Sequence, residues 1–364
     1  MVRLSDILKK ARERLKKPEP PAQIAGPCEP QPLKYLTPPP EAQKKEEPAQ
    51  VSEVRIAPVI MKEAKVTSEE ENLKLYNELE TLIKEILHGQ QRQIIDRQRI
   101  ALTIEKLVDQ LSLGDEKIFA VCLSKESTQT NYLICHLVNS CIYAIKIGLG
   151  LGYEKVKLID LGIAGLTFDI GMMKYLTLAN QTRKLNPKEY NEVKNHAALG
   201  SQILKNIPGL SPLVIDVAYQ HHERIDGSGY PRGLKVEAIN EFARIVGLAD
   251  VYEAMVHPRA YRVSFLPIEA IKEILKIKHS FEYKLIKILI ERIGIFPIGS
   301  RVELNTREIA EIIKLNYSIP LRPVVRVIYG VNGQSLTEAK VLDLNTQPAV
   351  YIVGGIRKEG LVFN

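Results

Sequence analysis

The chain has 364 residues, of which 45% are hydrophobic and 26% are charged, as in ordinary globular proteins. These figures exclude a collagen-like chain, a disulfide scaffold and a fully disordered chain, and they leave room for one large domain or two ordinary ones. The formal net charge is +7, but residues 1–17 alone carry seven Lys or Arg and two Asp or Glu. The rest of the chain is therefore close to neutral, which argues against a general nucleic-acid-binding surface.

No segment predicts a membrane span or an exported protein. The longest uncharged stretch, residues 133–145, is interrupted by His136, Asn139 and Ser140. Residues 1–17 lack the continuous apolar core of a signal peptide. The four cysteines show neither metal-binding spacing nor disulfide density, so we expect a reduced, cytoplasmic protein.

The first 66 residues divide into a basic segment and a proline-rich one. Apolar residues recur at helical spacing in residues 1–17, namely at Leu4, Ile7, Leu8, Ala11 and Leu15. One interpretation is an amphipathic helix that docks on a protein partner or on the anionic inner membrane face, and the other is a solvated tail. Residues 18–66 contain eleven of the 21 prolines and few large apolar residues, so we expect a disordered linker.

Helical periodicity predicts that the folded body is mainly α. We expect a helical extension over residues 67–112, a helical domain over 113–295 and a small β-rich appendage over 296–364. The extension is marked by an apolar stripe made of Leu75, Leu79, Leu82, Ile83 and Ile86.

Two local signals are well marked. Asn186 and Pro187, followed by Glu189, predict the start of a helix that we extend to residue 206. Near the end of the chain, short runs rich in Val and Ile predict strands, with a hairpin at Asn332-Gly333.

The residues that carry chemistry are imidazoles and carboxylates set into apolar helices: His136, Asp169, His196, His221, His222 and Asp250. Burying a carboxylate on such a face is costly unless it meets a cation, a hydrogen-bond network or a metal. Each residue taken alone also fits a core histidine, or an Asp that caps a helix or pairs with an Arg. Together they suggest one converging site, because imidazoles with a bridging carboxylate are normal ligands of iron, manganese, zinc or nickel.

The motif His221-His222-Glu223-Arg224-Ile225-Asp226-Gly227-Ser228-Gly229-Tyr230-Pro231 resembles the HD-GYP subgroup of the HD phosphohydrolase superfamily. The resemblance covers roughly residues 110–330, including Phe296-Pro297-Ile298-Gly299. It implies a bacterial, helical HD-domain bundle that hydrolyses the second messenger cyclic di-GMP at a centre of two or three metals. Diguanylate cyclases with a GGDEF domain are implied as protein partners, and a homodimer is left open.

The resemblance also assigns roles, residue by residue. Asp169 is implied as the catalytic, bridging carboxylate between two metals. One metal would take Asp169, His196, His221 and His222, and the other would take His136, Asp169 and Asp250. Phosphate contacts fall on Arg259 and Arg262, for which the end of a surface helix is the plain alternative. The loop beside the site, called the GYP loop below, comprises Asp226, Gly227, Gly229, Tyr230 and Pro231.

Three departures from the family pattern stand in this sequence. Phe168 replaces the His of the His-Asp pair, and a phenyl ring offers no lone pair to a metal. Met172 replaces a Lys near the scissile phosphate, and Tyr132 replaces an acidic ligand of the three-metal members. Lys174 is the nearest cation that could compensate. We therefore expect one nearly intact metal position, one incomplete position and about one bound ion, iron or manganese first, with zinc and nickel as alternatives.

Three hypotheses on function follow. The leading one is a degenerate HD-GYP protein that binds cyclic di-GMP or a signalling partner and hydrolyses it slowly or not at all. The second is an active, metal-dependent cyclic di-GMP phosphodiesterase that tolerates Phe168. The third is an interaction scaffold that recruits diguanylate cyclases through the GYP loop.

Overall fold

The computed structural model describes residues 69–89, 97–125, 128, 131–181, 183–257 and 264–357. The predicted docking segment 1–17, the linker 18–66 and both Arg259 and Arg262 lie outside the described residues. Within the described part, helices occupy the chain as far as residue 293 and strands follow from residue 301. The predicted mainly α fold with a small C-terminal β part is confirmed.

The helical part comprises ten-residue and longer helices joined by short turns and short helices. In chain order the elements are α2 (Glu69–Gly89), α3 (Arg97–Ser112), α4 (Ile118–Ser124), α5 (Tyr132–Gly150), α6 (Lys155–Thr167), η1 (Ile170–Tyr175), α7 (Leu176–Ala179), α8 (Pro187–Val193), α9 (His196–Lys205), α10 (Pro212–Gln220), η2 (Val236–Ala238), α11 (Glu241–Val256), α12 (Pro267–Lys276), η3 (Lys278–Ser280) and α13 (Tyr283–Ile293).

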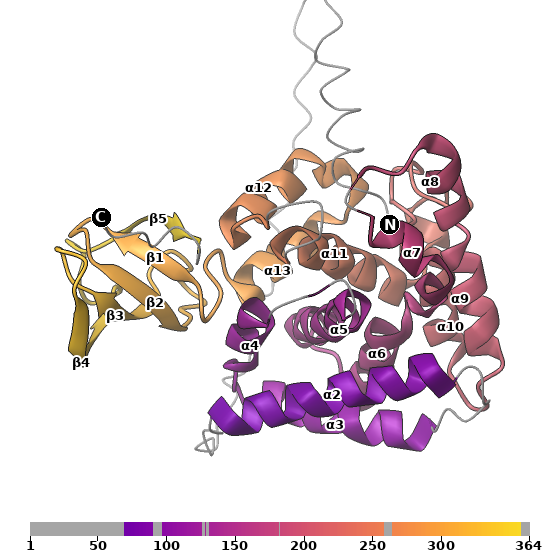
Figure 1. Cartoon of the computed structure of the whole chain (residues 1–364), viewed down its shortest axis with the longest axis horizontal. Coiled ribbons are helices and arrows are strands. Elements are labelled where there is room, and N and C mark those ends of the chain that lie inside the picture. Colours follow the sequence, from indigo (N-terminus) through magenta and orange to yellow (C-terminus); the bar gives the residue numbers. More distant parts are fainter. Residues whose placement is uncertain are drawn as a thin grey trace, which may run out of the picture. The chain divides into compact units, whose positions relative to one another are not determined.

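Helix α5 is the central element of the helical part. Figure 1 shows it with α2 and α3 on one side and α11 to α13 on the other, and every residue from Cys135 to Gly148 is buried. Most of these buried residues are apolar, and the polar ones among them, such as His136, Asn139 and Lys146, have buried partners on other elements. Among the described helices it alone has the length and composition to cross a membrane, but 89% of its most apolar window is buried inside the protein. It therefore has the burial of a core helix.

The segment predicted as one helix over 187–206 is two helices. Its start is as expected, since the Asn186 side chain accepts a hydrogen bond from the Glu189 N–H at 2.9 Å in a capping box. The helix ends at Val193, however, and α9 begins at His196 after a turn through Lys194 and Asn195. Neither turn residue is Gly or Pro, so helical periodicity gave no sign of the break.

The strands form one antiparallel sheet in the order β4-β3-β2-β1-β5. They span β1 (Arg301–Leu304), β2 (Ile309–Lys314), β3 (Val324–Tyr329), β4 (Ser335–Asp343) and β5 (Ile352–Ile356). The predicted hairpin joins β3 and β4, and Gly333 takes a φ of 76° in its turn, a conformation that glycine adopts without strain. Alternate residues such as Val302, Leu304 and Val325 are buried and build the core of this sheet.

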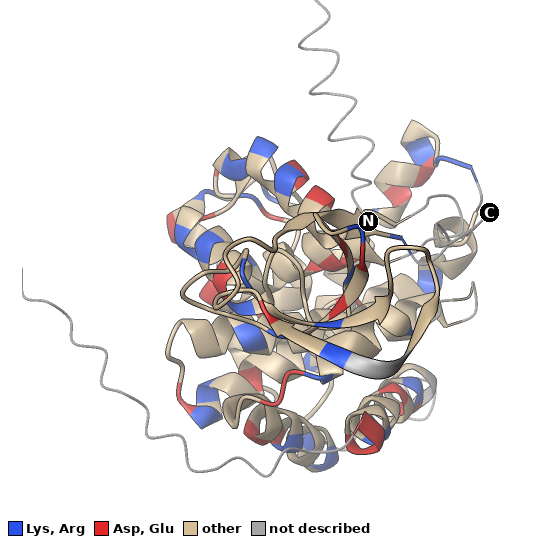
Figure 2. Ribbon diagram, turned by 90° about the vertical axis from the view of Figure 1, so that its left-hand side faces the viewer, with Lys and Arg blue, Asp and Glu red and all other residues tan. Residues whose placement is uncertain are grey.

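The sheet contacts the helical part through a polar cluster in which Glu116 and Lys146 are buried. Glu116 accepts hydrogen bonds from the Lys146 ammonium of α5 and from the Tyr317 hydroxyl in the β2–β3 loop. The Arg292 guanidinium of α13 lies 5.4 Å from the centre of the Tyr317 ring. Elsewhere, Figure 2 shows Lys and Arg interspersed with Asp and Glu along the helices, with no extended stretch of one sign in that view.

Candidate metal centre

The structure brings together all six residues proposed as metal ligands. They come from five places: His136 in α5, Asp169 between α6 and η1, His196 at the start of α9, His221 and His222 after α10, and Asp250 in α11. All are buried, with exposed fractions of at most 4%. Residues far apart in sequence therefore form one internal cluster, in which five carboxylate–imidazole pairs lie within 4.0 Å.

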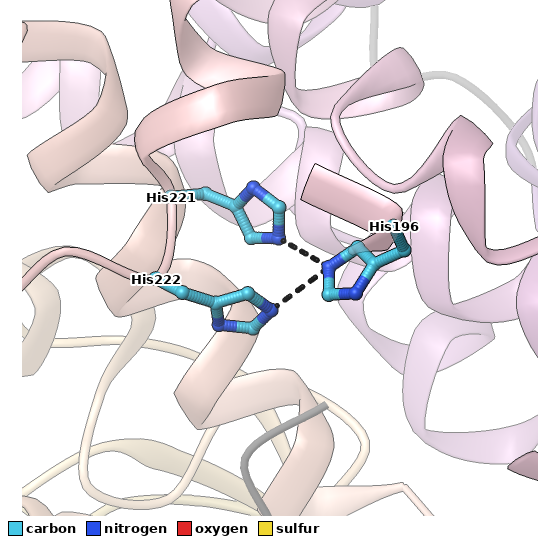
Figure 3. Close-up of side chains that lie close together, drawn as sticks. All are labelled: His196, His221 and His222. Atoms are coloured by element: carbon cyan, nitrogen blue, oxygen red, sulfur yellow. Dashed lines mark hydrogen bonds between the residues drawn. The ribbon is translucent and has the colours of Figure 1, made fainter. Parts of the chain in front are cut away.

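Three imidazoles form the tightest part of this cluster (Figure 3). The Nε2 atom of His196 lies 3.3 Å from Nε2 of His221 and 3.1 Å from Nε2 of His222. One nitrogen from each ring falls within 4.8 Å of the others. This spacing allows a single ion to reach all three rings.

The backbone determines which nitrogen of two of these rings carries the proton. His196 Nδ1 lies 2.6 Å from the Val193 carbonyl and His221 Nδ1 lies 3.1 Å from the Ala218 carbonyl. A carbonyl only accepts, so each Nδ1 donates and each Nε2 carries a lone pair. The two lone pairs face each other across 3.3 Å, an arrangement that a shared cation stabilises.

Burial keeps these rings neutral. It lowers the pKa of His221 to about 4, and burial followed by neighbouring imidazoles lowers the pKa of His222 and of His196 well below the usual value. At neutral pH the favoured cation is therefore a metal and not a proton, because neutral imidazole is the form that ligates. This donor set fits a divalent transition metal.

Asp169 lies between the two predicted metal positions. Its Oδ1 is 3.2 Å from His196 Nε2, and its Oδ2 is 4.0 Å from His136 Nε2. The carboxylate reaches this place because η1 packs directly on α9: a Cβ on Gly171 would lie 2.1 Å from the His196 carbonyl oxygen. Only glycine fits there, so Gly171 allows the approach that brings Asp169 to the imidazoles.

The second position contains His136 and Asp250. His136 Nε2 lies 3.2 Å from Asp250 Oδ1, while its Nδ1 contacts the Glu253 carboxylate. Burial alone would lower the pKa of His136, but Glu253 and Asp250 outweigh it and raise this pKa to about 9. Burial likewise acts to raise the pKa of Asp250, and the hydrogen bond and charge of His136 hold it well below its usual range.

Two of the three departures from the family pattern, Phe168 and Tyr132, lie against His136 of this second position. Phe168 is fully buried and points an edge toward His136 and His221, with ring centres 5.6 Å and 4.8 Å away. Met172 is 1% exposed, and the Tyr132 ring stacks on His136 at 5.8 Å. None of these three side chains offers a metal the imidazole or carboxylate that it replaces.

The cation suggested as a replacement for the missing Lys is exposed. Lys174 places its ammonium over the Tyr175 ring, 5.7 Å from the ring centre. A second cation, Lys194, was not predicted from the sequence; its ammonium lies 5.2 Å from the centre of the Tyr230 ring, which in turn stacks on His222. In the sequence, Lys194 could have been identified because it stands two residues before His196.

Glu253 was also overlooked. It is fully buried and contacts His136, and it follows Asp250 by three residues, the spacing that puts two side chains on one face of a helix. A second carboxylate on the apolar helix α11 was therefore visible in the sequence.

The GYP loop folds back over His222. The Glu223 carboxylate accepts hydrogen bonds from the backbone N–H of Arg232 at 2.7 Å and of Leu234 at 2.8 Å, which closes the loop. The Tyr230 ring stacks on His222 with 4.5 Å between centres. Several residues in the loop and directly after it are exposed: Asp226, Ser228, Pro231, Arg232 and Gly233.

Comparison with known proteins gives the family. The model of the HD domain matches residues 81–284, and the model of a KOW domain associated with the HD domain matches residues 301–361. A cyclic di-GMP phosphodiesterase of Pseudomonas aeruginosa is 30% identical over 241 residues, covering 65% of this chain and 58% of that protein. A cyclic di-GMP phosphodiesterase of Borreliella burgdorferi is 29% identical over 221 residues, covering 60% and 56%.

A solved structure has the same fold. It is an HDG"Y"P protein from Bdellovibrio bacteriovorus, 17% identical, with a TM-score of 0.53 over 63% of this chain and 74% of that one. The chain spans less than two thirds of the length of either phosphodiesterase. The HD match covers more than half of the chain, so this chain belongs to the HD domain family, and the motif from His221 to Pro231 that leads into the imidazole cluster resembles the HD-GYP type within it.

Proposed function

We propose that this chain binds cyclic di-GMP at a site that holds one divalent transition metal firmly, and that it hydrolyses the dinucleotide slowly or not at all. The observation that carries the proposal is the contrast within the site. Three neutral imidazoles and Asp169 converge on one position, whereas the other keeps a single imidazole, His136, because Phe168, which contacts both His136 and His221, stands where the family pattern has a His. The names of the two phosphodiesterase relatives support the choice of ligand.

The first position would hold the metal through His196, His221, His222 and Asp169. A metal bound there supplies Lewis-acid polarisation of a phosphoryl oxygen and lowers the pKa of a bound water. The protein contributes the geometry, since the Val193 and Ala218 carbonyls fix two rings with their lone pairs turned inward. Burial lowers the pKa of His221, so at neutral pH protons do not compete with a metal for its lone pair.

The second position lacks the means to complete hydrolysis. Its remaining donors are His136, Asp169 and Asp250, and Phe168 leaves it one imidazole short. Met172 removes a cation near the phosphate as well. Loss of one donor that stabilises the transition state costs on the order of a hundredfold or more in rate. Slow or absent turnover follows from these two replacements together.

Binding of the dinucleotide would use cations at the edge of the site. Arg259 and Arg262 remain the family-implied phosphate contacts, and they lie outside the described residues. Lys194 is a further candidate because its ammonium lies 5.2 Å from the centre of the Tyr230 ring, which stacks on His222. An anionic phosphate there would meet a positive charge that no described carboxylate neutralises in an ion pair.

A scaffold function is favoured by one observation. The outer part of the GYP loop is exposed while its inner part is held by Glu223, so the loop presents a preformed surface. A diguanylate cyclase would be the partner that the family implies. This function is compatible with a slow enzyme and does not need the second metal position.

The experiment combines metal analysis with nucleotide binding. We expect about one ion per freshly purified chain by plasma mass spectrometry, because four protein ligands make one stable site. Calorimetric titration with cyclic di-GMP should give saturable binding, and chromatography should show little linear product in excess manganese. Two tightly held ions with sustained turnover would support the active phosphodiesterase instead. Absence of nucleotide binding, together with recovery of a GGDEF protein, would support the scaffold.

A further inference from the structure

A chain of buried hydrogen bonds connects α2 to the second position. The Tyr76 hydroxyl donates to Asn139 Oδ1 at 2.9 Å, and Asn139 Nδ2 donates to Glu253 Oε1 at 3.2 Å. The other oxygen of Glu253 contacts His136 Nδ1. All four residues are at most 1% exposed, so water does not compete with these bonds. Three helices, α2, α5 and α11, contribute to the chain.

The chemistry of the groups fixes the direction of every bond. An ionised carboxylate only accepts, so Glu253 requires donors on both oxygens, and Asn139 and His136 supply them. Nδ1 of His136 must then carry a proton, which leaves Nε2 turned toward Asp250 at 3.2 Å and Asp169 at 4.0 Å. The bond between Nδ1 and Glu253 thus determines that Nε2 is the nitrogen that faces the site.

We propose that Glu253 is the positioning residue of the second cation position, and that Tyr76 and Asn139 hold its carboxylate in place. A carboxylate behind a ligating imidazole fixes the orientation of the ring and raises its basicity, and losing such a partner typically costs about 10- to 100-fold in metal affinity. The identity of the cation as a metal rests on the function proposed above. The hydrogen-bond chain itself does not depend on that function.

The chain also makes α2 part of the site. Tyr76 is fully buried on α2, and its ring lies under the Lys125 ammonium at 5.1 Å. A displacement of α2 would remove the donor that holds Asn139, and Asn139 would then release Glu253. His257 also faces this carboxylate, with Nδ1 3.7 Å from Glu253 Oε1, the oxygen that accepts from Asn139 and not the one that meets His136.

The first test reads the proton on His136 directly. Full-length, metal-free protein labelled with ¹⁵N-histidine should show a far-downfield proton on Nδ1 of His136, as expected for a buried imidazole N–H that donates to a carboxylate. Glu253→Gln keeps the shape of the side chain but removes its charge, and it should abolish that downfield position. Tyr76→Phe should shift the same resonance by less. Tyr252→Phe is the matched control, because Tyr252 is fully buried one residue before Glu253 and its hydroxyl has no hydrogen-bond partner among the described residues.

The second test measures metal affinity. Protein loaded with one equivalent of Zn²⁺ is titrated with more Zn²⁺ by calorimetry at fixed pH. We expect Glu253→Gln to weaken the second binding event at least about tenfold, Tyr76→Phe to weaken it less, and both to leave the first event unchanged. An unaltered His136 resonance in Glu253→Gln would overturn the proposal. So would equal weakening of both events, which indicates a general structural role. A wild type that binds two ions equally tightly would instead refute the one-metal function and leave the resonance test intact.

Discussion

The two sides of the metal centre contain the same kinds of residue in opposite electrostatic settings. On one side, His196 and His221 face each other and turn their Nδ1 atoms to backbone carbonyls, which are neutral acceptors. On the other side, His136 lies between Asp250 and Glu253, which are charged acceptors. Burial therefore keeps the first pair neutral, whereas the carboxylates keep His136 protonated in the metal-free protein.

This difference shows that burial alone does not decide whether an imidazole can ligate. His136, His196, His221 and His222 are all almost completely buried, yet burial lowers the pKa of the last three, while Glu253 and Asp250 outweigh burial and raise the pKa of His136. A metal that enters the first side displaces no proton, whereas one that enters the second side must displace a proton from His136. Variants on either side of the centre can therefore test this asymmetry.

Removal of a ring from the first side should abolish tight metal binding. His221→Ala and His222→Ala each delete one donor of the three-imidazole cluster. Loss of a group that only hydrogen-bonds a metal ligand typically lowers metal affinity about 10- to 100-fold, and loss of the ligand itself should lower it more. Metal content of the purified protein is the measurement. His279→Ala is the control, because the His279 side chain is 67% exposed and lies outside the cluster. Retention of a full equivalent of metal in either variant would contradict the assignment.

Repair of the second side should raise activity. Phe168→His combined with Met172→Lys restores the missing imidazole and cation, and cyclic di-GMP hydrolysis should rise on the order of a hundredfold. The single substitutions serve as controls and should give smaller gains, since each leaves one defect. Both sites are buried, so the melting temperature of each variant must be checked alongside. Wild-type turnover equal to that of the double variant would refute the view that Phe168 limits activity.

The stability of the metal-free protein should fall on both sides of neutral pH. The pKa of His136 is raised from 6.5 to about 9, so its contribution is complete below pH 6.5 and is lost as the pH rises toward 9. The pKa of His221 is lowered from 6.5 to about 4, so the folded state loses stability as the pH falls from 6.5 toward 4. Each pKa unit is worth about 1.4 kcal/mol.

Chemical denaturation across this pH range measures the effect. His136→Gln should flatten the alkaline limb and leave the acid limb, because the imidazoles of the first side remain. A metal-free protein whose stability is constant from pH 6.5 to 9 would contradict the protonated state of His136.

Deletion of residues 1–60 should have the smallest effect on the site. The asymmetry arises from residues in α5, α9, α10 and α11, so metal content and melting temperature should stay almost unchanged. Recovery of a partner or attachment to anionic vesicles should weaken in a salt-sensitive manner, since each basic residue near such a surface contributes about 1 kcal/mol. A large drop in melting temperature would show that the segment packs on the domain, against the docking hypothesis.

The sequence by itself predicted the fold class and the six residues that meet in the site. Residues such as Asp250 stand out because a carboxylate in an apolar helix needs a partner, and the motif from His221 to Pro231 is long enough to identify the HD-GYP type. The replacement at Phe168 was equally plain, because a phenyl ring cannot donate a lone pair. These inferences depend on residue type and spacing, which the sequence contains.

Tertiary structure decided what each residue does. The break between α8 and α9 has no Gly or Pro to mark it in the sequence, and the close packing of Gly171 in η1 on the start of α9 is equally absent from it. The protonation of His136 depends on Glu253, which lies 117 residues away in the chain. Hydrogen bonds and electrostatic fields act over a few ångströms in space, so which histidine meets a carbonyl and which meets a carboxylate is fixed only when the helices pack.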